Sequence, residues 1–193
     1  MLAKLVNCNT SSGPLPAVVV FVLCALFARP LLASEAGQYL SVGDFLSAAF
    51  DGEQPQAKVY WLPAPLKQEI RRLTGRDFPL LRVRYWQQGE RSAWILDEIG
   101  KEMPITIGVV VERQAIRRVD ILAFRESRGW EVRHPFFTRQ YVGAGLNEQR
   151  ALNRHVDGIT GATLSVRAVT HVARLALLLA REALPPQPEG AAP

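Results

Sequence analysis

Cysteine is almost absent from this chain. Its two cysteines, Cys8 and Cys24, both lie within residues 1–36, which we predict to be an export leader. Once that leader is removed, the rest of the chain contains no thiol. This excludes disulfide scaffolding, thiol catalysis and metal binding by cysteine for the exported domain.

The common phosphate-binding fingerprints are missing as well. The chain has neither the GxxxxGKS/T of a P-loop nor the GxGxxG of a dinucleotide fold. His134, His155 and His171 lack the spacing of metal ligands, and no CxxCH sequence is present to attach a haem. No pairing of a nucleophile with a base is evident. The sequence therefore predicts no metal site and no catalytic residues.

Positive charge exceeds negative charge only mildly, with a formal net charge of +5 at pH 7. One dense group of arginines lies in an alternating, strand-like stretch: Arg113, Arg117, Arg118, Arg125 and Arg128. We interpret it as the solvated face of a sheet. Because no nucleic-acid-binding motif accompanies it, we expect no nucleic-acid partner.

The N-terminal segment has the pattern of an export signal. Lys4 precedes an unbroken apolar run over residues 17–28, which suits a signal peptide and is short for a membrane span. Ser34-Glu35-Ala36 then has the small-x-small form of a cleavage site, and cleavage after Ala33 is the alternative. We therefore predict a signal peptide over residues 1–36 and a periplasmic or otherwise extracytoplasmic domain. The alternative is an uncleaved anchor over residues 14–33, which would hold the domain at the cytoplasmic membrane.

Residues 37–99 carry no motif and form the N-terminal part of the predicted domain. Apolar periodicity and turn residues predict the elements of the chain as far as residue 124. They are helices over 38–50 and 66–73, and strands over 58–62, 80–86, 92–97, 105–111 and 115–124. Closely spaced strands joined by short turns predict an antiparallel meander.

The pattern changes after Gly129. A short helix is predicted over 135–141, and a long helix from about Thr163 to Leu184 has a wide apolar face that must lie across the core. The predicted fold is therefore α+β, a single domain in which an antiparallel sheet packs with helices and the long helix comes last. Residues 185–193 are rich in proline, glycine and alanine, and we predict a disordered tail.

The most informative segment stands directly before the long helix. Residues 157–165 read Asp-Gly-Ile-Thr-Gly-Ala-Thr-Leu-Ser, with two glycines and three hydroxyl residues. A helix start offers unpaired N–H groups and the positive end of the helix dipole, which together favour an anion. The alternative is that Thr160 and Thr163 only cap the helix.

Three segments carry a resemblance to a known family. Residues 157–163 match the pattern D-x-x-S/T-G-A-S/T, and Glu126-Ser127-Arg128-Gly129 is similar to E-T-x-G, with serine in place of threonine. Residues 137–143 are similar to F-x-x-Q-F/Y-x-G. On these segments, residues 100–183 resemble the FMN-binding domain family. The domain occurs in the sodium-translocating NADH:quinone reductase and in the Rnf complex.

The resemblance implies FMN as the cofactor and Thr163 as its attachment site. In the family, the last residue of the pattern carries FMN through a phosphoester bond, and a flavin transferase that recognises the motif transfers FMN from FAD. The neighbours that we expect to surround the phosphate and the ring are Thr160, Gly161, Ala162, Leu164 and Ser165. Asp157 either bonds to the backbone of the motif or is recognised by the transferase.

The upstream segment is implied to lie close to the flavin. Glu126 and Ser127 would then contact the ring, with Gly129 beside them; the alternative is an exposed hairpin end. Trp130 either stacks on the ring or belongs to the core.

These observations favour an exported FMN-binding electron-transfer protein with a covalent threonyl flavin. We expect an electron carrier rather than an enzyme with its own substrate. Its implied partners are the flavin transferase and a membrane or periplasmic redox donor and acceptor. The alternatives are a small periplasmic flavin-dependent reductase and a flavin-binding or structural module without redox activity.

Overall fold

The computed structural model describes residues 37–184. The predictions for the leader, both cysteines and the tail concern residues outside that range. The elements in chain order are α2 (Val42–Ala49), β1 (Ala57–Trp61), α3 (Ala64–Thr74), β2 (Arg82–Gln88), β3 (Arg91–Ile99), β4 (Pro104–Glu112), β5 (Ala115–Phe124), the 3₁₀ helix η1 (Trp130–Arg133), α4 (Pro135–Thr138), the 3₁₀ helix η2 (Arg139–Tyr141) and α5 (Thr163–Ala183).

The strands form one five-stranded sheet in the order β1-β2-β3-β4-β5, and every neighbouring pair is antiparallel. Consecutive strands are thus spatial neighbours, as in a meander, and α3 connects the first strand to the second. The predicted α+β class is confirmed. Strand β2 begins at Arg82 rather than at the predicted Leu80.

Helix α2 is shorter than predicted because the residues before it join the sheet. The backbone N–H of Tyr39 donates to the carbonyl of Leu122 in β5 at 2.8 Å. Ser41 then caps the helix, since its side-chain oxygen accepts the N–H of Asp44 at 3.0 Å. The helix therefore begins at Val42.

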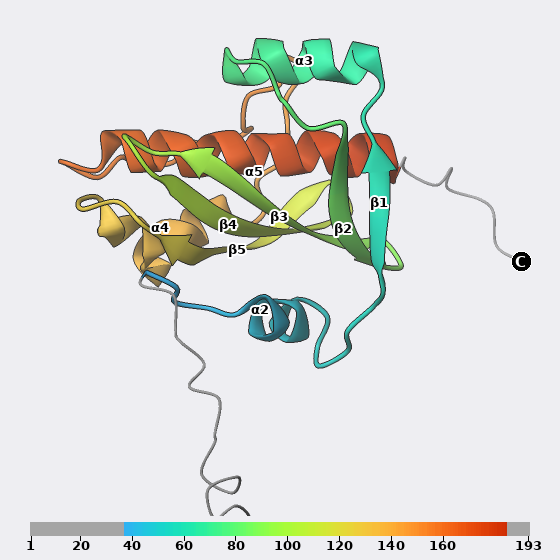
Figure 1. The fold of residues 1–193 in the computed structure, drawn as a ribbon, viewed down its shortest axis with the longest axis horizontal. Coiled ribbons are helices and arrows are strands. Elements are labelled where there is room, and N and C mark those ends of the chain that lie inside the picture. The colour runs from blue at the N-terminus through green and yellow to red at the C-terminus, as the bar shows by residue number, and fades with distance from the viewer. Residues whose placement is uncertain (1–36, 185–193) are drawn as a thin grey trace, which may run out of the picture. The chain divides into compact units, whose positions relative to one another are not determined.

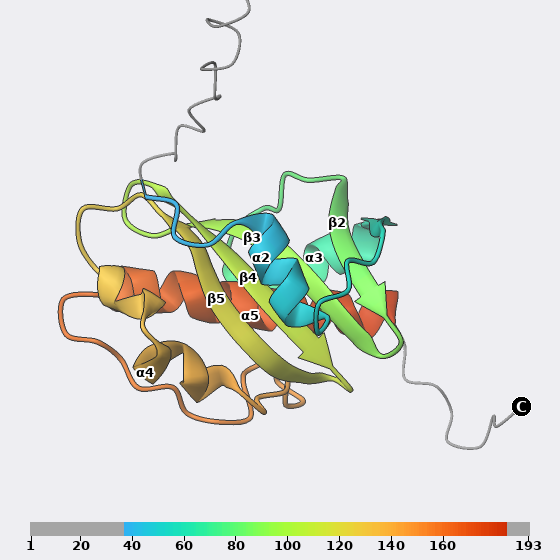
Figure 2. The same ribbon diagram turned by 90° about the horizontal axis from the view of Figure 1, so that it is seen from below.

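Helices cover both faces of the sheet. Helices α5 and α3 lie on one face and α2 on the other (Figure 1), and the view from the α2 side shows α5 behind the strands (Figure 2). Helix α5 is long and apolar enough to span a membrane, but most of it is buried in the domain. Its prediction as a core helix is confirmed. The buried side chains between α5 and the sheet include Trp94, Ile105, Ile107, Val109, Val169, Val172 and Leu178.

Burial of α5 fixes the position of its first turn. Each fully buried large apolar side chain stabilises the fold by about 1.5–3 kcal/mol. Several such side chains along α5 outweigh the small intrinsic preference of any residue for a helix. The sheet and α5 are consequently a rigid support for Thr163, the first residue of the helix.

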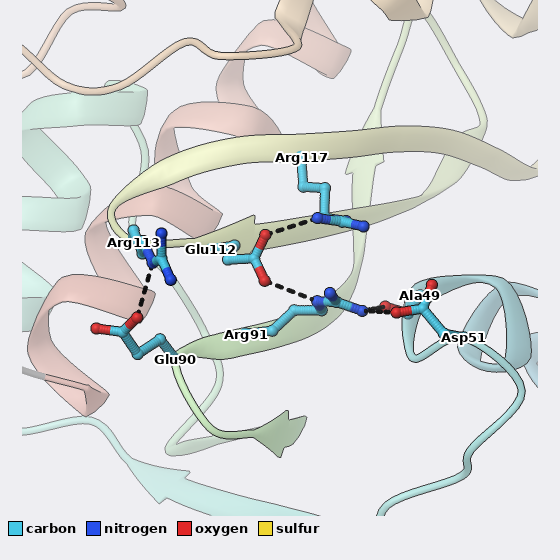
Figure 3. Close-up of polar contacts among 7 residues, drawn as sticks. All are labelled: Ala49, Asp51, Glu90, Arg91, Glu112, Arg113 and Arg117. Carbon is cyan, nitrogen blue, oxygen red and sulfur yellow. Dashed lines mark hydrogen bonds and ion pairs between the residues drawn. The ribbon is translucent and has the colours of Figure 1, made fainter.

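An arginine ties α2 to the sheet. The guanidinium of Arg91 donates to the carbonyl of Ala49 at 3.0 Å, to Asp51 at 2.7 Å and to Glu112 at 3.1 Å (Figure 3). The Ala49 carbonyl belongs to the last turn of α2, where a cation is favoured. Arg91 therefore holds the C-terminal end of α2 against β3 and β4.

The arginine group predicted from the sequence is largely paired within the domain. Arg117 donates to Glu112 at 2.7 Å, and Arg113 donates to Glu90 at 2.9 Å (Figure 3). The guanidinium of Arg118 donates to the neighbouring Asp120. These pairs offset much of the positive charge of this face.

A histidine on α5 lies in an unfavourable place for a positive charge. Burial and the guanidiniums of Arg167, Arg174 and Arg76 hold the pKa of His171 below its usual 6.5. Glu98 lies 3.9 Å from Nδ1 and favours the charged ring, but burial and the three cations outweigh it.

We expect the protein to lose stability as the pH falls below about 6.5, because the unfolded chain then binds a proton that folded His171 resists. The effect grows until the pH reaches the lowered pKa of the folded protein. Thermal unfolding at about pH 7.5 and about pH 5.5 measures it. His171→Gln should reduce the difference in melting temperature, whereas His155→Gln, at an exposed site, should leave it unchanged. Equal pH dependence in both variants would contradict this assignment.

Candidate functional site

Three segments that are far apart in the sequence meet near the first turn of α5. They are residues 126–129 after β5, residues 137–143 around α4 and η2, and residues 157–163, which lead into the helix. These are the same segments that carry the family resemblance. Figure 2 shows α4 beside β5, with the long connection returning to the start of α5. The contacts that join them are described in turn.

The start of α5 is open to an anion. Ala162 is the N-cap residue, and no side chain caps the helix. The alternative that Thr160 or Thr163 serves as the cap is therefore wrong. The N–H groups of Thr163, Leu164 and Ser165 have no acceptor within the helix, because such acceptors would lie before its first residue. Together with the helix dipole, they form a site that favours a phosphate.

Gly129 brings the upstream segment against this turn. Its φ is +85°, and a Cβ atom built on it would lie 2.4 Å from Oγ of Ser165 and 3.4 Å from Cβ of Ala162. Both contacted residues are buried. Only glycine combines this backbone conformation with so close an approach. Gly129 therefore acts through packing, as the point where residues 126–129 meet α5.

The third segment holds the loop before α5. The side-chain oxygen of Gln140 accepts the backbone N–H of Asp157 at 2.7 Å. The hydroxyls of Tyr141 and Thr170 lie 2.8 Å apart and share a hydrogen bond. Burial raises the pKa of Tyr141, which keeps the phenol neutral. Gln140 and Tyr141 thus connect η2 to the loop before α5 and to α5 itself.

The carboxylate of Asp157 points away from these contacts. Its side chain is exposed and lies 3.4 Å from Nε2 of the equally exposed His155. Within residues 37–184, that carboxylate accepts no hydrogen bond from the backbone of the motif. The structure therefore leaves this carboxylate exposed, without a hydrogen bond from the described residues that would stabilise the turn of the motif.

Glu126 organises the turn between β3 and β4. One carboxylate oxygen, Oε1, accepts the backbone N–H groups of Lys101 at 2.5 Å, Glu102 at 2.7 Å and Met103 at 2.9 Å. Burial opposes ionisation of Glu126, but the three N–H donors outweigh it and hold its pKa below the ordinary value. Glu126 therefore fixes the turn that carries Lys101.

We expect Glu126→Ala to loosen this turn and to destabilise the fold by about 1–3 kcal/mol, because three N–H groups lose a charged acceptor. Glu126→Gln should cost less, since an amide oxygen still accepts but carries no charge. Urea unfolding measures both free energies. A matched control is Glu148→Ala, at an exposed position in the loop before α5. Equal stability of wild type and Glu126→Ala would refute the structural role.

A cleft of about 610 Å³ lies beside the first turn of α5. Seven of the predicted site residues line it: Glu126, Ser127, Gly161, Ala162, Thr163, Leu164 and Ser165. Thr163 is exposed, and Leu164 presents an apolar surface with 42% of its area accessible. The first turn therefore places a hydroxyl, free N–H groups and an apolar side chain at one cleft.

The other predicted site residues do not line this cleft. Gly129 packs behind it, whereas Asp157 and Thr160 lie on the exposed loop that approaches α5. Trp130 is 43% exposed, so the alternative that it belongs to the core is wrong. Its indole packs edge-on against His134 at 5.2 Å, and the Arg133 guanidinium lies 4.9 Å from the ring centre.

Two cations in the cleft were not predicted as site residues. Lys101 and Arg128 both line it, and each adds positive charge close to the helix start. Arg167, which lies one turn along α5 from Thr163, does not line the cleft. Pairing of β4 with β5 places Ile105 opposite Phe124, so the turn before β4 must lie near residue 126. The pairing of these two predicted strands could therefore have indicated that Lys101 lies near the site.

A comparison with known families now identifies the domain. Residues 100–178 match the FMN-binding domain family, and this part of the chain is an FMN-binding domain. The protein is therefore an FMN-binding flavoprotein, and FMN is its cofactor. No curated protein and no solved structure gives a significant match.

The residues present fit this cofactor. The uncapped first turn and two nearby cations suit a phosphate, and the exposed Leu164 offers an apolar contact for a ring. Within residues 37–184, no group of three histidine, cysteine or acidic side chains is arranged to hold a metal ion. The uncapped turn, the two cations and the exposed Leu164 suit a phosphorylated organic cofactor.

Proposed function

We propose that the protein is an exported electron carrier whose FMN is linked covalently through its phosphate to Thr163. The observation that carries the proposal is the position of Thr163, whose exposed side chain lies at an uncapped helix start and lines the cleft. The N-terminal sequence pattern, with Lys4 before the apolar run of residues 17–28, supports export.

Attachment is a phosphoryl-type transfer from FAD catalysed by a separate flavin transferase. The hydroxyl oxygen of Thr163 forms a bond to the phosphorus next to the riboflavin, and the bond from that phosphorus to the AMP oxygen breaks. The hydroxyl proton is released, AMP leaves, and no oxidation or reduction occurs. Exposure of Thr163 and of Asp157 makes both accessible to a transferase.

The chain's own residues position and stabilise the flavin. The N–H groups of the first turn receive the remaining phosphate charge, and Lys101 and Arg128 add cations at the same cleft. Leu164 supplies an apolar surface. Bound FMN supplies reversible one- and two-electron chemistry, while the protein sets its orientation and its electrostatic surroundings.

The same FMN site is compatible with two other functions. A small periplasmic reductase would pass electrons directly to a substrate, and a non-redox module would bind flavin without cycling. The accessible cleft beside Thr163 is already needed for the flavin itself, and this favours a carrier that exchanges electrons with partner proteins in the periplasm or at the membrane.

Titration of the holoprotein with dithionite, followed by reoxidation, separates these functions. We expect the flavin absorbance to bleach and return completely, with no steady-state consumption of a small electron acceptor. Sustained turnover with such an acceptor would favour the reductase. A flavin that resists reduction would contradict both redox functions.

A further inference from the structure

The sheet opens between β2 and β3. The two strands pair only from Tyr85 opposite Trp94 to Gln88 opposite Arg91, although β3 continues to Ile99. The first residues of β2, from Arg82 to Arg84, pair with β1 on one edge and, in the described part of the chain, have no partner strand on the other. The last part of β3, by contrast, pairs with β4 alone. Both strands therefore present a free edge to the space between them.

The backbone groups of β3 that face this gap follow from strand alternation. The Gly100 N–H donates to the carbonyl of Met103 at 3.2 Å, across the turn to β4, so even-numbered residues at this end direct their backbone toward β4. Ile95, Asp97 and Ile99 therefore direct theirs into the gap. Pairing with β2 ends at Trp94, so within residues 37–184 Asp97 and Ile99 have no partner strand on this side, whereas Ile95 still flanks the last pair.

Strand β2 faces the gap in the same way. The carbonyl of Leu81 accepts the N–H of Leu62 at 3.0 Å, which places odd-numbered residues toward β1. The backbone groups of Arg82 and Arg84 consequently point toward β3. Unpaired edges of this kind are templates for an added strand.

A cavity of about 480 Å³ occupies the gap. Its walls include Val83 and Leu96, which belong to the core beneath α5, and Arg84 and Asp97, which are exposed. Because residues of both faces line it, the cavity lies at the gap between the strands. Leu175 of α5 also lines it.

The surroundings specify what kind of strand fits. Toward α5, the walls combine the apolar Val83, Leu96 and Leu175 with Glu98, whose carboxylate is paired with Arg76. On the outer face lie the exposed Arg82 and Arg84, and neither forms an ion pair within the described part of the chain; the Arg82 guanidinium lies 5.4 Å from the centre of the Trp61 ring. A strand between β2 and β3 would therefore place alternate side chains against apolar and basic surfaces.

Exposed apolar residues border the opening. Leu80 is 48% exposed and Ile99 is 47% exposed, and both line the cavity. Trp61, the last residue of β1, is 63% exposed, and Leu81, which directly precedes β2, is 65% exposed. Clusters of exposed apolar side chains mark protein-interaction surfaces.

We infer that this gap receives an extended segment of a partner protein, in which apolar and acidic residues alternate, as an additional strand between β2 and β3. Its backbone satisfies the free edges, its apolar side chains face Leu175, and its acidic side chains face Arg82 and Arg84. Strand β3 leads directly into the turn that carries Lys101, so the partner is held beside the flavin cleft. Binding does not require the flavin.

Fluorescence anisotropy with labelled peptides tests this inference on the full chain. The probe is a peptide in which valine and glutamate alternate, and the control peptide replaces glutamate with lysine. We expect the glutamate peptide to bind wild type at least about tenfold more tightly than the lysine peptide. The double variant Arg82→Glu with Arg84→Glu should reverse that preference, whereas Arg72→Glu, an exposed change on α3 outside the cavity, should retain it.

A second variant tests the backbone hydrogen bonds between β3 and the added strand. Ile99→Pro removes an N–H that faces the gap without removing a hydrogen bond to β4. We expect this variant to bind the glutamate peptide at least about tenfold more weakly than wild type. Circular dichroism checks that each variant is folded. The Thr163→Ala protein should bind the peptide like wild type, which separates this test from that of flavin attachment. Absence of peptide binding, identical affinity for both peptides, or self-association that the peptide does not disrupt would overturn the inference.

Discussion

Thr163→Ala should yield a folded protein without covalent flavin. The substitution removes the only atom through which Thr163 can form a phosphoester, while the exposed side chain makes little contribution to the core. After coexpression with a flavin transferase and denaturation in acid, we expect flavin fluorescence in the wild-type protein band and at most about one hundredth of it in the variant, because no alternative ester oxygen occupies that position.

Two matched substitutions show whether the loss is specific. Thr163→Ser keeps a hydroxyl at the first residue of α5 and should retain covalent flavin. Thr160→Ala changes a threonine of the same exposed loop that does not line the cleft, and it should retain the ester oxygen at Thr163. Persistent fluorescence in Thr163→Ala, or its loss only in Thr160→Ala, would show that the attachment residue is wrongly assigned.

Gly129→Ala should have the largest effect on stability. A left-handed backbone costs alanine about 1–2 kcal/mol, and a Cβ atom 2.4 Å from Oγ of Ser165 adds about 1–3 kcal/mol through overpacking. We therefore expect a loss of about 2–5 kcal/mol in the free energy of unfolding. Urea denaturation measures it, and covalent flavin should decrease because the first turn of α5 is displaced.

Gly75→Ala is the control for this experiment. Gly75 ends α3 with φ of +73°, but a Cβ atom there would meet nothing within 4 Å. Gly75→Ala should lower the free energy of unfolding only through its left-handed backbone, by about 1–2 kcal/mol, and should leave covalent flavin unchanged. Equal destabilisation by the two changes would mean that the contact between Gly129 and Ser165 contributes nothing.

Local patterns explain why much of the fold was predictable. The strands over 105–111 and 115–124 combine apolar runs with a turn between them, and the structure places them at Pro104–Glu112 and Ala115–Phe124. The apolar face of α5 likewise follows from its own residues. The start of α2 was mispredicted because Tyr39 bonds to β5, a long-range contact that no local pattern records.

Some residues of the site could likewise be predicted from local sequence, and others could not. Thr163 could be proposed as the attachment residue from a contiguous motif, because the proposed attachment needs one residue in one local sequence. The roles of Lys101 and Gln140 depend on contacts that form only on folding. Lys101 reaches the cleft through the pairing of β4 with β5. The Gln140 side chain, in η2, accepts the backbone N–H of Asp157. The packing of Gly129 on Ser165 also depends on tertiary structure, since a positive φ and a close approach are invisible in sequence.

Peptide mapping by mass spectrometry tests the central claim most directly. The protein is coexpressed with a flavin transferase, digested, and searched for a peptide whose mass is increased by one FMN less water. We expect that mass on the peptide containing residues 157–165, with fragmentation locating it on Thr163. An unmodified peptide, or FMN on any other residue, would contradict covalent attachment at the start of α5.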